Sequence, residues 1–346
     1  MFRHWLFSVA AAQPSHAVFR VATPVMNGHK PLTMAPQDNR DTKSGFLYAG
    51  GAYLIWSVLP LYMKLLSHIP AWEIVAHRIV WSLPIAAFVM WWNGFGDDIK
   101  TALTNPRTLA LAFLTSALIS FNWGTYVWAV TSGHALETAL GYYINPLFSV
   151  FLAALLLGEK MNRVQMFAIG LAAVAVGVLT YENGGLPYVS LMLAFSWGFY
   201  AYFKKTLAIG ATQGFFLEVL ILGIPALAVM AWLERVGTSH FFHTGWQDVA
   251  LLTVSGLFTA LPLMFYAKGA KGLRLTTIAL MQYSAPTMIF LIAVFVFKEP
   301  FSLYKGLAFV LIWTALAIYT WSLVKAARFP LRHASRDTSP ASGRGK

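Results

Sequence analysis

The feature that most constrains this chain is a series of ten apolar segments, each long enough to cross a membrane as a helix. About 20 helical residues span the roughly 30 Å hydrocarbon core of a bilayer. Strands with open edges would leave backbone amides unpaired in lipid, so helices are expected. The sequence therefore predicts an all-α integral membrane protein with ten transmembrane helices, near residues 45–66, 72–92, 109–130, 136–157, 164–181, 186–203, 214–233, 247–267, 275–297 and 301–324.

Composition supports the same class. Hydrophobic residues make up 58% of the chain and charged residues 11%, whereas soluble domains carry about 25% charged residues. The chain has no cysteine, which excludes disulfides and thiolate metal sites. The net charge of +12 is explained by the basic loops and tails of a membrane protein, so no nucleic-acid partner is expected.

The distribution of Lys and Arg predicts the orientation. With both termini in the cytoplasm, 20 of the 25 basic residues fall on the cytoplasmic side. Lys and Arg are enriched in cytoplasmic loops. We therefore expect a multi-pass protein of a bacterial inner membrane with both ends cytoplasmic.

An internal repeat divides the chain into halves. Leu136–Glu159 and Thr276–Glu299 are similar and lie 140 residues apart, with a proline 13 positions before the final glutamate in each. Five helices per half is an odd number, so the second half enters the membrane from the opposite side, as in inverted-repeat transporters. The expected organisation is an N-terminal extension (1–44), two five-helix repeats (45–181 and 186–324) and a basic cytoplasmic tail (325–346).

Four long stretches carry a family resemblance. They are EIVAHRIVWS (73–82), NWGTYVWAVTSGHALETALGYYINPL (122–147), LAFSWGFYAYFKK (193–205) and RLTTIALMQYSAPTMIFLIAV (274–294). They resemble the RarD branch of the EamA family, in the drug/metabolite transporter superfamily. The resemblance implies ten helices in two inverted repeats and export of small metabolites or drugs. Such proteins are commonly labelled as chloramphenicol-sensitive or chloramphenicol-resistance permeases. The resemblance to this superfamily also makes a homodimer a possible assembly.

Polar and aromatic residues near matching prolines predict a substrate site. Aromatic walls with a few hydrogen-bonding groups suit an amphipathic ligand, and a proline frees a carbonyl about one turn earlier. Helix-packing contacts are the alternative. The candidates are Trp56, Asn122, Tyr126, Tyr142, Tyr143, Asn145, Trp197, Tyr266, Gln282 and Tyr283, with Pro146 and Pro286 as structural prolines.

Four ionisable residues within the spans are candidates for a functional role. Glu73 and His77 share a helix face, with Arg78 beside it; they form either a charged cluster in the pathway or an ion-pair set that anchors the helix end. Glu218 matches His77 in the second half. It is expected either to couple transport to protons or to pair with Lys204 or Lys205.

Several enzyme classes lack their motifs. The chain has no phosphate-binding GxxxxGK[ST] loop, no GxSxG and no HExxH, so ATP-driven transport and intramembrane hydrolysis are not expected. No cofactor or metal is predicted. The expected function is secondary active export of a small molecule, with an uncoupled facilitator or a non-transporting sensor or scaffold as alternatives.

Overall fold

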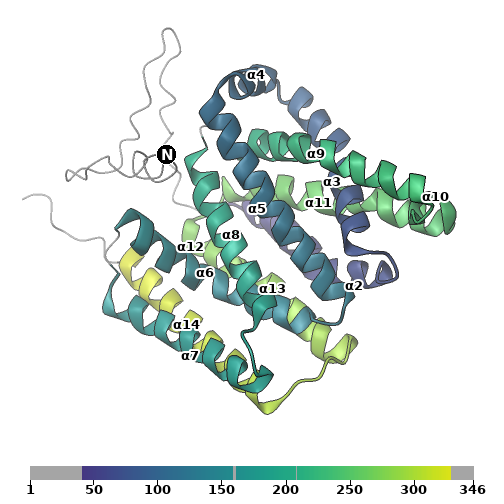
Figure 1. Cartoon of the computed structure of the whole chain (residues 1–346). Coiled ribbons are helices and arrows are strands. Elements are labelled where there is room, and N and C mark those ends of the chain that lie inside the picture. Colours follow the sequence, from purple (N-terminus) through teal and green to yellow (C-terminus); the bar gives the residue numbers. More distant parts are fainter. Residues whose placement is uncertain (1–40, 159–160, 208, 329–346) are drawn as a thin grey trace, which may run out of the picture.

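The computed structural model of this protein describes residues 41–158, 161–207 and 209–328 and is almost entirely helical (Figure 1). Most of the expected N-terminal extension and basic tail, together with Glu159, lie outside the described residues. The first half contains α2 (Lys43–Leu65), α3 (Ala71–Trp92), α4 (Gly96–Thr104), α5 (Pro106–Thr131), α6 (Ala135–Leu157) and α7 (Arg163–Asn183). The second contains α8 (Tyr188–Thr206), α9 (Ala211–Val236), α10 (His240–His243), α11 (Trp246–Ala270), α12 (Leu275–Met281), α13 (Ser284–Leu291), the π-helix η1 (Ile292–Val296) and α14 (Leu303–Arg328).

The expected fold class is confirmed. Within the described residues, nine helical spans are long and apolar enough to cross a membrane. The tenth is the 19-residue α8, which is less apolar because it carries two buried serines and ends in Lys204 and Lys205. The short α4 and α10 were not expected; they occupy loops between spanning helices.

The helix boundaries follow from local capping. The Asn105 side chain accepts hydrogen bonds from the first turn of α5, where Pro106 takes the first helical position, a position at which proline loses no needed donor. Asn162 and Gln165 form a capping box at the start of α7. Gly158 closes α6 with φ of 66°, and Lys298 takes the matching place after η1 with φ of 54°.

The two proline-containing spans differ. α6 continues as a helix through Pro146, whereas its copy is interrupted at Gln282 and Tyr283, between α12 and α13. A proline ring clashes with the carbonyl four residues earlier, and Gln282 is that residue for Pro286. The same span then widens into η1, where Phe297 N–H bonds to the carbonyl of Ile292. The similar sequences of the two spans predicted similar helices, but the structure has one continuous helix in the first half and an interrupted one in the second.

Glycines allow the two halves to approach closely. A Cβ on Gly256 of α11 would lie 2.2 Å from the backbone carbon of Trp81 in α3, and one on Gly269 would lie 2.5 Å from the amide nitrogen of Ala49 in α2. Gly170 and Gly177 of α7 differ from these two, because nothing lies within 4 Å of a Cβ added at either position. In Figure 1, α7 packs along α14 at one edge of the molecule.

Candidate functional site

Arg78 lies at the centre of the candidate site. It stands two turns into α3 and is only 3% exposed. Its Nε donates to Thr259 Oγ1 of α11 at 3.0 Å, so the contact joins the two halves. Its guanidinium carbon is 5.6 Å from the centre of the Trp123 ring. Its Nη1 has no hydrogen-bond partner, and no carboxylate among the described residues pairs with it.

Tyrosines surround this guanidinium. Tyr62 of α2, Tyr126 of α5 and Tyr142 of α6 are close enough to interact with it electrostatically. The rings of Tyr126 and Tyr142 are 5.9 Å apart, and the buried Tyr126 hydroxyl has no partner. We call Arg78, Tyr62, Trp123, Tyr126, Tyr142 and Thr259 the Arg78 cluster. It gathers one cation and unsatisfied donors among aromatic rings.

Asn145 has a further unsatisfied group. It is 7% exposed, and its Oδ1 is buried without a partner. It lies three residues after Tyr142 and therefore on a neighbouring part of the same helix face. Buried polar atoms are nearly always paired in folded proteins, so this acceptor, with Tyr126 and Arg78, gives α3, α5 and α6 three buried polar atoms that lack partners among the described residues.

Glu73 and His77 do not share the surroundings of Arg78. The fully buried Glu73 accepts from the backbone N–H of His240 at 2.7 Å and lies 2.8 Å from its Nδ1. The His77 ring stacks on Phe241 at 4.7 Å, and its Nδ1 accepts from Trp81 Nε1 at 3.2 Å. Both residues thus contact α10 or its neighbours, whereas Arg78 points into the bundle.

Glu218 forms a separate cluster with α8. Its Oε1 lies 2.6 Å from Lys204 Nζ, and its Oε2 accepts from the Tyr200 hydroxyl at 3.2 Å. The carboxylate is 1% exposed and the lysine side chain 19%. Of the two lysines suggested by the sequence, the structure selects Lys204.

Asn122 and Tyr143 have their polar groups occupied. Asn122 donates to the carbonyl of Leu193 and to Ser196, and so ties α5 to α8. The Tyr143 hydroxyl lies 2.6 Å from Thr287 Oγ1, and so ties α6 to α13. These hydrogen bonds hold neighbouring helices together, as the helix-packing alternative for Asn122 and Tyr143 predicts.

The remaining candidates lie in three places. Trp56 and Tyr266 form an aromatic group with Tyr53, with ring centroids 5.6 to 6.0 Å apart. Trp197 packs on Tyr200 at 5.6 Å, near the Glu218 cluster. At the break between α12 and α13, Gln282 Nε2 donates to the carbonyl of Ala279, and Tyr283 interacts with Gln282 and Thr320.

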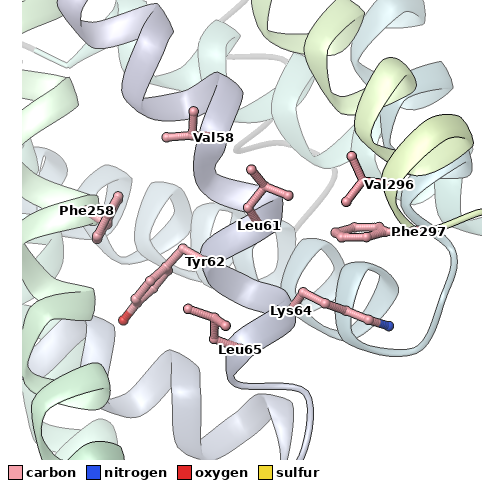
Figure 2. Close-up of a pocket in the computed structure, with 8 residues that line it drawn as sticks. All are labelled: Val58, Leu61, Tyr62, Lys64, Leu65, Phe258, Val296 and Phe297. Carbon is pink, nitrogen blue, oxygen red and sulfur yellow. The ribbon is translucent and has the colours of Figure 1, made fainter.

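A groove of about 660 Å³ opens beside the Arg78 cluster. Figure 2 shows that the groove runs between α2 and η1, with Val296 and Phe297 facing Leu61 and Lys64. Tyr62 belongs to both places: it lines the groove, stacks on Phe258 at 4.4 Å and donates its hydroxyl to the carbonyl of Leu251. Lys64 Nζ lies 5.4 Å from the centre of the Phe297 ring at the groove. Tyr62 therefore links the groove to the Arg78 cluster.

Comparison with known proteins decides the family. A model of the EamA-like transporter family matches residues 43–181 and 186–321. The chain belongs to this family. The uncharacterized transporter YojE of Bacillus subtilis is 41% identical over 298 residues, which cover 85% of this chain and 99% of that protein. The protein RarD of Streptomyces exfoliatus is 40% identical over 83% of this chain and 91% of its own length.

A solved structure supports the fold of this EamA-like transporter. A crystal structure covers 81% of this chain and 98% of its own, with a TM-score of 0.53 and 19% identity. The resemblance to the RarD branch is thus confirmed, and the protein is a multi-pass membrane transporter.

Sequence reasoning missed several residues of the site. Arg78 interacts with Tyr62 of another helix and with Thr259, which lies 181 residues later in the chain. Glu73 binds His240, which lies 167 residues later. The available signal for Thr259 was a hydroxyl deep inside an apolar span, which is also common in helix packing. His240 had no useful signal, because its partner lies 167 residues earlier.

Proposed function

We propose that this EamA-like transporter is a secondary active exporter of small amphipathic molecules and that the Arg78 cluster is its substrate-binding centre. The observation that carries this proposal is a buried guanidinium without a counter-charge. A cation at the centre of a spanning helix costs about 2.5–3.5 kcal/mol on insertion scales, which is an upper value for Arg78 two turns into α3, and an ionisable residue inside a span marks a functional site by default. Aromatic side chains from α2, α5 and α6 would hold the apolar part of the ligand.

Contacts between the halves at both ends of the bundle support alternating access. At the end that carries α10, Glu73 binds His240, and His68 lies 2.9 Å from Asp248. At the other end, Asp41 binds the side chain and backbone of Arg274. If one half rocks against the other, the contacts at one end of the bundle would break while the contacts at the opposite end stay formed.

A third contact at the α10 end involves Glu299. Its carboxylate accepts from the amides of Ala135 and Leu136 at 2.7 and 2.9 Å, and so caps the start of α6 from the second half. A negative charge is favourable at a helix N-terminus. Burial nevertheless raises the pKa of this carboxyl, against the lowering effect of the two amides. Opening this end would return Glu299 to water.

Glu218 is the proposed proton-coupling residue. Protonation would remove the negative member of its pair with Lys204 and free the lysine to move. We expect Glu218→Gln to remove the dependence of flux on the pH gradient. Gradient-dependent flux in this variant would assign Glu218 to packing instead.

We also propose that both termini are cytoplasmic, which places α10 outside. The absence of native cysteine makes this directly measurable. Gly185→Cys, in the exposed α7–α8 loop, should react with an impermeant maleimide in intact cells. Thr104→Cys, at the end of α4, should react only after the membrane is opened. The reverse pattern would invert the assigned orientation.

The function is tested by efflux from proteoliposomes loaded with radiolabelled chloramphenicol or phenylacetate, with and without an imposed pH gradient. If export is coupled, efflux from the proteoliposomes should be faster than efflux from protein-free liposomes loaded with the same solute, and it should depend on the pH gradient. Flux that ignores the gradient indicates a facilitator, and no flux of either solute from folded protein favours a sensor or scaffold. Asn145→Ala should abolish flux if the Asn145 Oδ1, which is buried without a partner among the described residues, binds the substrate. Gln282→Ala tests whether the α12–α13 break contributes.

A further inference from the structure

The surroundings of Arg78 constrain the charge of the ligand. Tyr62, Tyr126 and Tyr142 are neutral, as are Trp123 and Thr259, so every side chain that the described structure places around the guanidinium lacks a negative charge. The nearest acidic residue along α3 is Glu73, whose two oxygens are both bound to His240. A buried cation is normally paired, and no described residue supplies the negative member of this pair, so a bound ligand is a natural source of it.

The free hydrogen-bond donors have a matching arrangement. Arg78 uses Nε on Thr259 and leaves Nη1 unpaired, while the Tyr126 hydroxyl also lacks a partner. A guanidinium presents a planar fork that fits the two oxygens of a carboxylate or phosphoryl group. A hydroxyl beside it can donate to the same oxygens. A neutral amide oxygen could accept from these donors but would leave the charge of the guanidinium uncompensated, and an amine would meet a like charge.

We propose that the transported substrate is a small organic anion whose charged group binds Arg78 and Tyr126, with its apolar body against Trp123 and Tyr142. This inference rests on the proposed transport function and narrows its substrate class. The groove beside Tyr62 gives an amphipathic anion a route from the side. Lys64 and Tyr62 both line the groove (Figure 2), and Tyr62 also interacts electrostatically with Arg78. Arg78 is 3% exposed in this conformation, so entry of a ligand from the groove would require the side chains that cover it to move.

The test is equilibrium binding to the full chain purified in detergent, followed as a rise in melting temperature with ligand concentration. The probes are phenylacetate, its neutral isostere phenylacetamide, the cation phenethylamine, and phenylphosphonate. We expect stabilisation by one or both anions and at least roughly tenfold weaker binding of the amide and the amine, since hydrogen bonds to a charged partner are the stronger ones. A preference between the two anions identifies the carboxylate or the phosphoryl class.

Variants locate the binding. Arg78→Gln should weaken anion binding roughly 100-fold, and Arg78→Lys roughly tenfold because the ammonium lacks the planar fork. Tyr126→Phe removes only a hydroxyl and should weaken binding severalfold. It serves as the decisive variant where substitutions at Arg78 prevent folding. Arg235→Gln changes an exposed arginine of α9 that forms no ion pair among the described residues, and should bind as the wild type.

Two results would overturn the inference: equal or tighter binding of the amide or the amine, or no stabilisation by any probe. Unchanged anion affinity in Tyr126→Phe and in a folded Arg78→Gln would do the same. These outcomes are separable from failure of the proposed function, because binding is measured without flux. Anion-selective binding with no efflux would refute transport alone, and efflux of neutral chloramphenicol with no anion preference would refute the inference alone.

Discussion

The ion pair between Lys204 and Glu218 allows a quantitative prediction, because its two members differ in their access to water. Glu218 is 1% exposed, and the Lys204 side chain is 19% exposed in the last turn of α8. Lys204→Met would leave a buried carboxylate with only the Tyr200 hydroxyl as a partner. Removing one member of a buried pair costs about 3–5 kcal/mol when the other remains charged. We expect the free energy of unfolding to fall by about that amount.

The reverse substitution should cost less. In Glu218→Gln the remaining charge is the ammonium of Lys204, which sits on a flexible stem near the helix end and can extend to the polar boundary. Its position 5.5 Å from the centre of the Tyr200 ring offers a further favourable contact. We expect a loss of about 1–2 kcal/mol, in the range of a single hydrogen bond. The double variant should resemble Glu218→Gln, since no buried charge is left behind.

The measurement is equilibrium unfolding in mixed micelles with increasing sodium dodecyl sulfate, followed by helical circular dichroism. Lys205→Met is the matched control, because Lys205 is the exposed neighbour and forms no ion pair among the described residues; it should change stability by less than about 0.5 kcal/mol. The reasoning would be refuted by a Lys204→Met variant no less stable than Glu218→Gln. It would also fail if the two single losses simply added in the double variant.

Three further predictions concern backbone packing, pH and local strain. Gly256→Ala should separate α11 from the α3 backbone and abolish transport. In Gly124→Ala nothing lies within 4 Å of the added carbon, so this variant should transport normally and gain up to about 1 kcal/mol of stability from helix propensity. Equal transport by the two variants would contradict the packing argument. The guanidinium and backbone amide of Arg274 lower the pKa of the partly buried Asp41 carboxyl from 3.8 to about 2. The stabilisation is therefore complete above pH 3.8 and lost as the pH falls toward 2, so the unfolding curves of wild type and Asp41→Ala should converge over that interval. Lys298→Gly should stabilise the protein by about 0.5–1 kcal/mol in thermal unfolding, because the exposed lysine adopts φ of 54° where glycine has no steric penalty; a destabilised variant would show that the lysine side chain matters more than its backbone.

The sequence was sufficient for the spans and their repeat, because these depend on signals within a single segment. Apolar length predicted all ten spanning segments, and local capping residues such as Asn162 explain where they begin. The matching prolines were visible, but their unequal effect was not. Whether Pro146 is tolerated inside α6 while Pro286 follows a break depends on how the rest of each span packs, and a single-segment pattern does not contain that information.

The candidate site also depends on information outside a single segment. Glu73 and Arg78 have similar settings in the sequence, but only Glu73 has an ionisable partner among the described residues. Both are charged residues at the start of one apolar segment, five positions apart, and both are almost completely buried. Glu73 has found its partner in His240, 167 residues away; Arg78 has found only a threonine and aromatic rings. A satisfied buried charge is explained by the contacts that hold two helices together, whereas an unsatisfied one costs stability without a structural return. The partner that a distant segment does or does not supply therefore distinguishes the two residues, and this difference is the reason for proposing that Arg78, rather than Glu73, binds the ligand.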